Sequence, residues 1–191
     1  PVPAKQLKSA MLQKLIGLIE QSHDTLDCGF SSIPFLLDVL YENGYPEAAY
    51  RMLFCTEAPS WLYMIRNGAT TIWENWRAVK EDGTVTDSSF NHYAYGCIGE
   101  FLYRHIGGIE AIEPGFTRIR IAPDFDCGIR RSRCVRTVPA GEIVVEWNLD
   151  PQAQIRITLP EGVSAVLELP GETRELKGGA GYEVSIAKNG F

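Results

Sequence analysis

The chain has 191 residues, of which 45% are hydrophobic and 22% are charged, and its formal net charge is −6. This balance is typical of a globular protein with room for one or two domains. An acidic chain without a basic stripe is not expected to bind nucleic acids. Its apolar runs are far shorter than the roughly 20 residues that cross a bilayer, so no membrane segment is expected. No apolar leader core follows Pro1, and the sequence predicts neither a cytoplasmic nor an exported location.

The five cysteines are odd in number and irregularly spaced, and the chain has only three histidines. This pattern predicts neither a zinc site nor a disulfide framework, and no metal or cofactor is expected. Most of the thiols are expected to be small buried apolar groups. Cys127 and Cys134 could pair only if adjacent strands bring them together.

The first half of the chain has helical periodicity. Apolar residues and helix stop signals predict five helices. The first lies around residues 7–19, the second is capped by Ser32 and ends at residues 43–44, and the third begins at Pro46. A short fourth helix follows Pro59 around Trp61–Arg66, and the fifth runs from Tyr93 to Ile106. The second and third should form a helical hairpin. In the last helix, Leu102 should lie on the buried side with Ile98, Phe101 and Ile106.

The second half changes to short, β-branched, alternating segments. Strands are predicted over residues 116–121, 133–138, 142–148, 154–159, 164–169 and 182–187. Turn signals rich in Pro and Gly separate them, as in residues 160–162 and 178–181. Regular short strands with this punctuation indicate a β-sandwich, which begins after a boundary near residues 109–115.

Residues 68–76 (GATTIWENW) place one carboxylate, Glu74, between two indoles, Trp73 and Trp76. Sugars have apolar C–H faces that stack on aromatic rings, and hydroxyls that bind charged or amide groups. A Glu in this setting suits a sugar-cleaving site, where it can take a proton from water. The alternative is a buried aromatic pair with a Glu that reaches solvent, and this motif alone does not separate the two.

A second cluster of polar and aromatic residues follows at residues 88–96 (SSFNHYAYG). Its Asn, His and two Tyr side chains supply several hydrogen-bond donors and acceptors. The alternative is a helix N-terminus, with Ser89 or Asn91 as the N-cap and the tyrosines as half-buried aromatics. Taken alone, His92 is more typical of a structural histidine than of a catalytic one.

Together the two motifs resemble the bacterial α-L-rhamnosidases, family 78 of the glycoside hydrolases. The resemblance covers about residues 24–125 and depends on the order and spacing of several motifs. Besides the two above, these are LDCGF (26–30), PFLLDVL (34–40), ENGY (42–45), PSWLY (59–63), EPGF (113–116) and IRIAP (119–123).

The resemblance implies a fold. The family's catalytic domain is an (α/α)6 barrel followed by a C-terminal β-sandwich. We therefore expect an α+β multidomain chain, with residues 1–112 as the end of the barrel and residues 113–191 as an antiparallel sandwich. The barrel needs more helices than this chain supplies, so the chain is expected to be the C-terminal portion of a larger enzyme. Exposed apolar helix faces would then favour self-association.

The resemblance also implies chemistry. Family members are inverting, and the Glu of the first motif is their general base, which here is Glu74. The His of the second motif contacts the sugar, which here is His92, while Trp73 and Trp76 would help to shape the sugar pocket. The family's general acid lies upstream of this chain. We expect the full-length parent to release terminal α-L-rhamnose from a glycoside or oligosaccharide, and this segment alone to be inactive.

Three alternatives accompany this interpretation. The parent could be a barrel glycosidase with another sugar preference, because topology alone does not determine the substrate. Residues 113–191 could be a non-catalytic carbohydrate-binding module, although Trp147 is their only tryptophan. The segment could also be purely structural and close the barrel of its parent.

Overall fold

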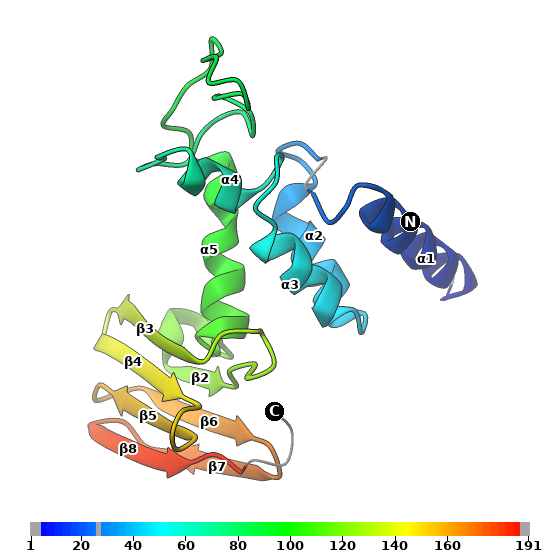
Figure 1. Ribbon diagram of the computed structural model, residues 1–191. Coiled ribbons are helices and arrows are strands. Elements are labelled where there is room, and N and C mark those ends of the chain that lie inside the picture. Colours follow the sequence, from blue (N-terminus) through cyan, green and yellow to red (C-terminus); the bar gives the residue numbers. More distant parts are fainter. Residues whose placement is uncertain (1–4, 26–27, 188–191) are drawn as a thin grey trace. The chain divides into compact units, whose positions relative to one another are not determined.

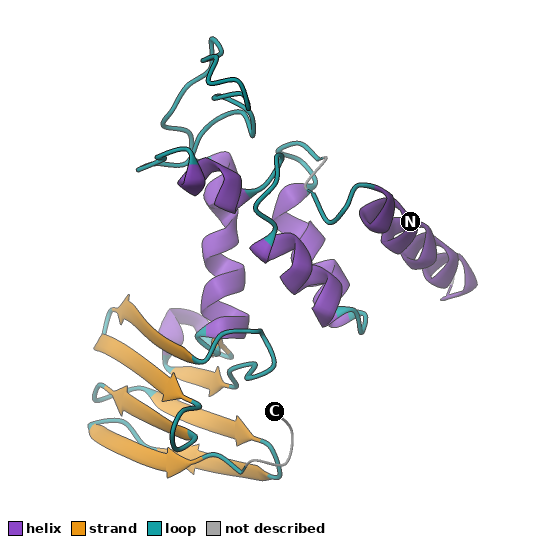
Figure 2. Ribbon diagram, in the orientation of Figure 1, coloured by secondary structure: helices purple, strands orange, loops and turns teal. Residues whose placement is uncertain are grey.

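The computed structural model describes residues 5–25 and 28–187, and the chain divides into two compact units, Pro1–Ile98 and Gly99–Phe191. The first unit contains helices and long irregular loops, and the second contains two β-sheets (Figures 1 and 2). The predicted α+β class, with helices before strands, is confirmed. Among the residues described, no helix has the length and apolar character that a bilayer crossing requires.

The framework of the first unit consists of α1 (Lys5–Gln21), α2 (Ile33–Glu42), α3 (Pro46–Phe54) and α4 (Trp61–Arg66). α2 and α3 pack against each other as the predicted hairpin. Gly44 joins them at φ +87°, a left-handed conformation that glycine adopts without strain. Leu40 and Ala49 are completely buried in this unit.

The starts of α2 and α4 differ in how they are capped. Ser32 precedes α2 as predicted, but its side chain makes no capping hydrogen bond. α4 begins after Ser60, whose hydroxyl accepts a hydrogen bond from the Tyr63 N–H at 3.0 Å. Because Ser60 is fully buried, this bond also satisfies a hydroxyl that has no access to water.

Apolar side chains of the helical unit remain exposed. Leu7 and Met11 lie in the helix predicted around residues 7–19 and are 56% and 55% exposed, and Phe35 of α2 is 66% exposed. Among the described side chains of α1, only Ile19 is buried. The helical periodicity is therefore correct, but the described part of the chain does not cover the faces that it creates.

The last predicted helix, from Tyr93 to Ile106, is confirmed in extent, with Tyr93 as its N-cap, but its turn type changes along its length. It consists of a 3-10 turn at Ala94–Cys97, α5 (Ile98–Phe101) and a π turn at Leu102–Ile106. Gly96 and Gly99 lie within these pieces, and glycine weakens a regular helix because its backbone has more conformational freedom. Leu102 is exposed, unlike Phe101 and Ile106, which are buried as predicted.

The second unit contains two four-stranded sheets with the orders β1-β2-β6-β7 and β3-β4-β5-β8. The strands are β1 (Ile109–Ala111), β2 (Arg118–Ile121), β3 (Arg131–Val138), β4 (Gly141–Asn148), β5 (Gln154–Leu159), β6 (Ser164–Leu169), β7 (Glu172–Leu176) and β8 (Ala180–Ser185). All pairs are antiparallel except β2 with β6, which is parallel. This pair departs from the predicted purely antiparallel sandwich. A parallel pair needs a long crossover, and the chain supplies one by passing through β3, β4 and β5.

Strands β1 and β7 were not predicted. β1 has only three residues, too few to show an alternation, and it forms a strand because Ile109 pairs with Ile121 of β2. β7 (ETREL) is charged along most of its length, and its middle residues are exposed at the edge of the sheet. The strand predicted over residues 116–121 begins later, at Arg118, because residues 114–116 form a 3-10 turn.

The core of the second unit follows the alternation of its strands. β4 and β5 bury every second side chain, namely Ile143, Val145, Trp147, Ile155, Ile157 and Leu159. The indole N–H of Trp147 donates to the carbonyl of Ile106 at 2.8 Å, so the polar atom of this buried ring is satisfied.

All five cysteines lie in the described part of the chain, and none of them forms a disulfide there. The possible pair of Cys127 and Cys134 therefore does not form. Cys134 packs closely against Gly107, where a Cβ would lie 2.5 Å from the Cys134 Sγ. Burial raises the pKa of both thiols, which favours the protonated apolar form expected from the sequence.

Replacing Ile155 with Ala should lower the free energy of unfolding by about 2–5 kcal/mol, because it leaves a cavity at a completely buried position. The matched control is Ile112→Ala in the same unit. Ile112 is exposed, so its loss should change the free energy by less than about 0.5 kcal/mol. Urea unfolding of both variants measures the difference, and equal effects would contradict the described core.

Candidate functional site

Three segments of the helical unit meet at the two sequence motifs. The main-chain N–H of Glu74 donates to the Ser89 carbonyl at 2.9 Å, and that of His92 donates to the Ile72 carbonyl at 2.8 Å. The Thr71 hydroxyl adds a hydrogen bond to the Phe90 carbonyl. The motifs at residues 68–76 and 88–96 are thus laid side by side without forming a regular strand pair. The third segment, residues 28–30, joins them through aromatic contacts.

The carboxylate of Glu74 is held by one specific hydrogen bond. Its Oε2 accepts from the main-chain N–H of Ser89 at 2.9 Å, and its side chain is only partly buried. Within the described part of the chain, Oε1 accepts no hydrogen bond. One oxygen therefore orients the group, and the other can interact with a water molecule.

His92 lies in a stack of aromatic rings. Its ring is 4.9 Å from that of Phe30 and 5.0 Å from that of Tyr93, with interplanar angles of 12° and 16°. Its Nδ1 accepts a hydrogen bond from the Ala94 N–H at 3.2 Å. An Nδ1 that accepts must be unprotonated, so the neutral ring carries its hydrogen on Nε2.

Trp73 and Trp76 are buried, with 3% and 7% of their surfaces exposed. The ring of Trp73 meets Phe90 edge to face at 5.2 Å. Trp76 stacks on Tyr95 at 3.6 Å, and its indole N–H donates to the Cys28 carbonyl at 3.0 Å. Neither indole therefore presents an open face for a sugar. Their part in shaping a pocket remains a prediction. Buried in this way, the two indoles would act by supporting the loops that form the pocket.

Phe30 and Tyr95 belong to the same cluster of aromatic contacts as Trp76 and His92. Sequence analysis assigned Phe30 no role and considered Tyr95 only as a hydrogen-bonding group of the second motif or as a half-buried aromatic. Phe30 is 42% exposed and contacts both His92 and Tyr95. The Tyr95 ring is buried, and burial raises the pKa of its hydroxyl. Both residues lie within the motifs of the family resemblance, which is the sequence signal that could have pointed to them. Their contacts join segments more than 60 residues apart, so only the fold reveals them.

The helix-cap interpretation of residues 88–96 is wrong in detail. The Ser89 hydroxyl accepts from the Asn91 N–H at 3.1 Å, which closes a local turn rather than a helix start. The first helical turn begins at Ala94, and the side chain that accepts its N–H is that of His92.

The loop that joins the two motifs is fastened to α4. The hydroxyl of Tyr63 donates to the Val79 carbonyl at 2.8 Å, and Val79 forms an isolated bridge with Val85. Burial is the main cause that raises the pKa of Tyr63, so its hydroxyl keeps the proton that it donates. These contacts restrict the loop and therefore help to hold Glu74 beside Ser89.

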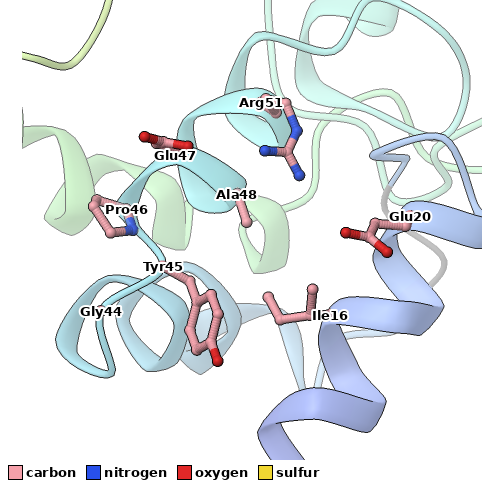
Figure 3. Close-up of a pocket in the computed structure, with 8 residues that line it drawn as sticks. All are labelled: Ile16, Glu20, Gly44, Tyr45, Pro46, Glu47, Ala48 and Arg51. Carbon is pink, nitrogen blue, oxygen red and sulfur yellow. The ribbon is translucent and has the colours of Figure 1, made fainter.

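A hollow of about 390 Å³ lies elsewhere in the helical unit (Figure 3). It is lined by side chains of α1 and α3 and by the turn before α3, with Tyr45 and Arg51 among them. None of its lining residues comes from the two motifs. Among the described residues, no group of His, Cys, Asp and Glu converges as a metal site.

The match to known families covers almost the whole chain. Residues 2–106 match the bacterial α-L-rhamnosidase six-hairpin glycosidase domain, and residues 108–183 match the bacterial α-L-rhamnosidase C-terminal domain. The chain belongs to the bacterial α-L-rhamnosidase family. The predicted resemblance is confirmed, as is the fold class of a six-hairpin domain followed by a sheet domain.

Curated relatives of this rhamnosidase-family chain are named α-L-rhamnosidase. An α-L-rhamnosidase of Formosa agariphila is 34% identical over 176 residues, which are 90% of this chain and 19% of the relative. One of Streptomyces avermitilis is 37% identical over 144 residues, 74% of this chain and 14% of the relative. The chain thus spans at most about a fifth of these relatives.

Solved structures show the same likeness. The native α-L-rhamnosidase from Aspergillus terreus has a TM-score of 0.85 at 32% identity, covering 95% of this chain and 22% of that one. The Streptomyces avermitilis α-L-rhamnosidase complexed with L-rhamnose has a TM-score of 0.82 at 33% identity, covering 88% and 17%. At these identities the likeness extends beyond topology to the family.

Trp76→Ala should destabilise the protein by about 3–5 kcal/mol, because it removes a buried indole and its hydrogen bond to Cys28. Tyr93→Ala is the matched control. Tyr93 is 88% exposed in the neighbouring motif, so its loss should change stability by less than about 0.5 kcal/mol. Thermal or urea unfolding compares them. A Trp76→Ala variant as stable as the parent would show that the indole is not part of the core.

Proposed function

We propose that the chain is the C-terminal portion of a longer inverting α-L-rhamnosidase that releases terminal α-L-rhamnose from glycosides or oligosaccharides. One observation carries this proposal: the Glu74 carboxylate is anchored by Ser89 in a chain whose family models cover residues 2–106 and 108–183. The names of the relatives support the substrate class.

Glu74 acts as the general base. It takes a proton from water while the water oxygen attacks the anomeric carbon on the face opposite the leaving group, which inverts the configuration. The Ser89 N–H restrains Oε2, and Oε1 is the oxygen that receives the proton. A carboxylate held before the reaction needs less reorganisation during it. The general acid that protonates the leaving oxygen lies in the part of the enzyme upstream of this chain.

His92 contacts the sugar. With Nδ1 accepting from Ala94, the neutral imidazole offers its Nε2–H as a donor to a rhamnose oxygen. Trp73 and Trp76 support the two loops from the inside and so shape the pocket without stacking on the sugar. The Streptomyces avermitilis relative was crystallised with L-rhamnose, which supports rhamnose as the ligand.

The two halves of the chain have different roles in this proposal. Residues 1–112 complete the barrel and supply the base, and residues 113–191 form the C-terminal sandwich. β1 precedes that boundary and already pairs with β2, so the linking segment contributes an edge strand to the sandwich. Earlier helices of the longer protein would cover the apolar faces of α1 and α2.

A carbohydrate-binding role for the sandwich alone is less well supported. Such modules present aromatic rings to a glycan, but Trp147, the only tryptophan of residues 113–191, is 2% exposed and its N–H is bonded within the protein. The base and the sugar contact that support hydrolysis lie in the helical unit instead.

Glu74→Gln in the longer protein should lower kcat for an α-L-rhamnoside by about 100-fold or more, because the amide cannot accept the proton from water. The amide oxygen can still accept from the Ser89 N–H, so the fold and L-rhamnose binding should persist. Steady-state kinetics and calorimetry measure the two properties.

The matched control for this experiment is Glu81→Gln, which changes an exposed Glu of the same loop that pairs with Arg77. It should retain parental activity. A Glu74→Gln enzyme with more than about a tenth of parental kcat would refute the assignment of the base.

The 191-residue chain alone should not hydrolyse an aryl α-L-rhamnoside at a measurable rate. An aryl leaving group needs little acid assistance, so this substrate is the most sensitive probe. The base must still be positioned within about 3 Å of a bound water, and much of the pocket lies outside this chain. Its exposed apolar faces should also make it self-associate, which light scattering would show.

The purified chain should be assayed beside its Glu74→Gln variant to identify contaminating activity. Turnover that disappears in the variant would show that these residues form a complete site without upstream helices.

A further inference from the structure

A continuous series of aromatic contacts connects the buried Trp76 to His92. Trp76 stacks on Tyr95 at 3.6 Å, Tyr95 meets Phe30 at 5.0 Å, and Phe30 stacks on His92 at 4.9 Å. Tyr93, on the other side of His92, is almost fully exposed. Phe30 is therefore the ring that connects the imidazole to the buried part of the cluster.

The loop that carries Phe30 is itself fixed to the motif segment. The carbonyl of Cys28, two residues earlier, accepts the indole N–H of Trp76 at 3.0 Å. Phe30 thus reaches His92 from a third segment of the chain, independently of the hydrogen bonds that join residues 72–74 to residues 89–92.

Among the described residues, one hydrogen bond reaches the His92 side chain, and it does not by itself determine the orientation of the ring. The Ala94 N–H restrains Nδ1, but a ring held through one atom can still tilt about that contact. The nearly parallel face of Phe30 restrains the ring plane, and with it the direction of the Nε2–H bond. An aromatic pair of this kind changes a conformational equilibrium by about 2- to 12-fold.

We propose that Phe30 is a positioning residue, which holds the imidazole of His92 so that its Nε2–H points at the bound rhamnose. This inference rests on the proposed function, because it takes His92 as a sugar contact. Phe30 would act through His92, and its effect should therefore vanish when His92 is absent.

The test is a double-mutant cycle in the longer protein with Phe30→Leu and His92→Ala. L-Rhamnose affinity is measured by calorimetry, and KM and kcat with an aryl α-L-rhamnoside. Phe30→Leu keeps an apolar side chain but removes the flat ring. It should weaken L-rhamnose binding and raise KM by about 2- to 12-fold. Its kcat should change less than KM, since a contact made equally in the ground and transition states affects binding alone.

Two further variants separate positioning from general stability. Phe30→Tyr keeps the ring and should restore parental affinity. Phe54→Leu is the matched control, because Phe54 is 39% exposed, close to the 42% of Phe30, and stacks on Tyr50 outside the cluster. It should leave rhamnose affinity unchanged even if the melting temperature falls.

The expected result is that His92→Ala weakens binding and that adding Phe30→Leu causes no further loss. Additive losses, or a Phe30→Leu protein that binds normally, would overturn the positioning role while His92 kept its place in the proposed function. If His92→Ala binds rhamnose as tightly as the parent, the assigned sugar contact fails, and the role of Phe30 fails with it.

Discussion

The candidate site depends on the reciprocal bonding between Glu74 and Ser89. The main chain of each residue donates to the other, once to a carbonyl and once to the carboxylate, at 2.9 Å in both cases. These bonds lock together two loops that have no regular secondary structure at this point. An irregular loop lacks the repeating bonds of a helix or sheet, so specific contacts of this kind determine its path. The same two bonds therefore fix both the position of the carboxylate and the path of the loops.

Burial of the tryptophans complements this constraint. An indole is large and apolar, and Trp76 contacts Tyr95, Trp61 and the Cys28 carbonyl at once. Such a ring stabilises the loops that surround it. The smaller polar groups at the surface of these loops then remain available to bind a ligand. Burial of the two indoles agrees with the alternative interpretation of the motif, while the role of Glu74 stays a proposal. Both indoles are buried, and Trp76 connects to His92 through Tyr95 and Phe30.

The two units differ in how completely they bury their apolar surface. The sandwich closes two sheets over side chains such as Ile143 and Ile155, which have no exposed surface. The helical unit leaves Leu7, Met11 and Phe35 open to solvent. Apolar stripes on helices need a neighbouring element to cover them, which the longer protein that we propose would supply. This contrast agrees with a chain that spans about a fifth of its relatives.

The sequence by itself determined the helices α1 to α4, six of the strands and the family, because hydrophobic period, Pro and Gly positions and motif order are local properties. It also named Glu74 and His92, through motif matching rather than through geometry. Tertiary structure alone decided the rest. The short β1 and the charged β7 form strands because neighbours pair with them, and the parallel β2–β6 pair follows from the path of the chain. The contact of Phe30 with His92 joins residues 62 positions apart. No local pattern encodes such a distance, because packing between segments, rather than the preference of either one, brings those rings together.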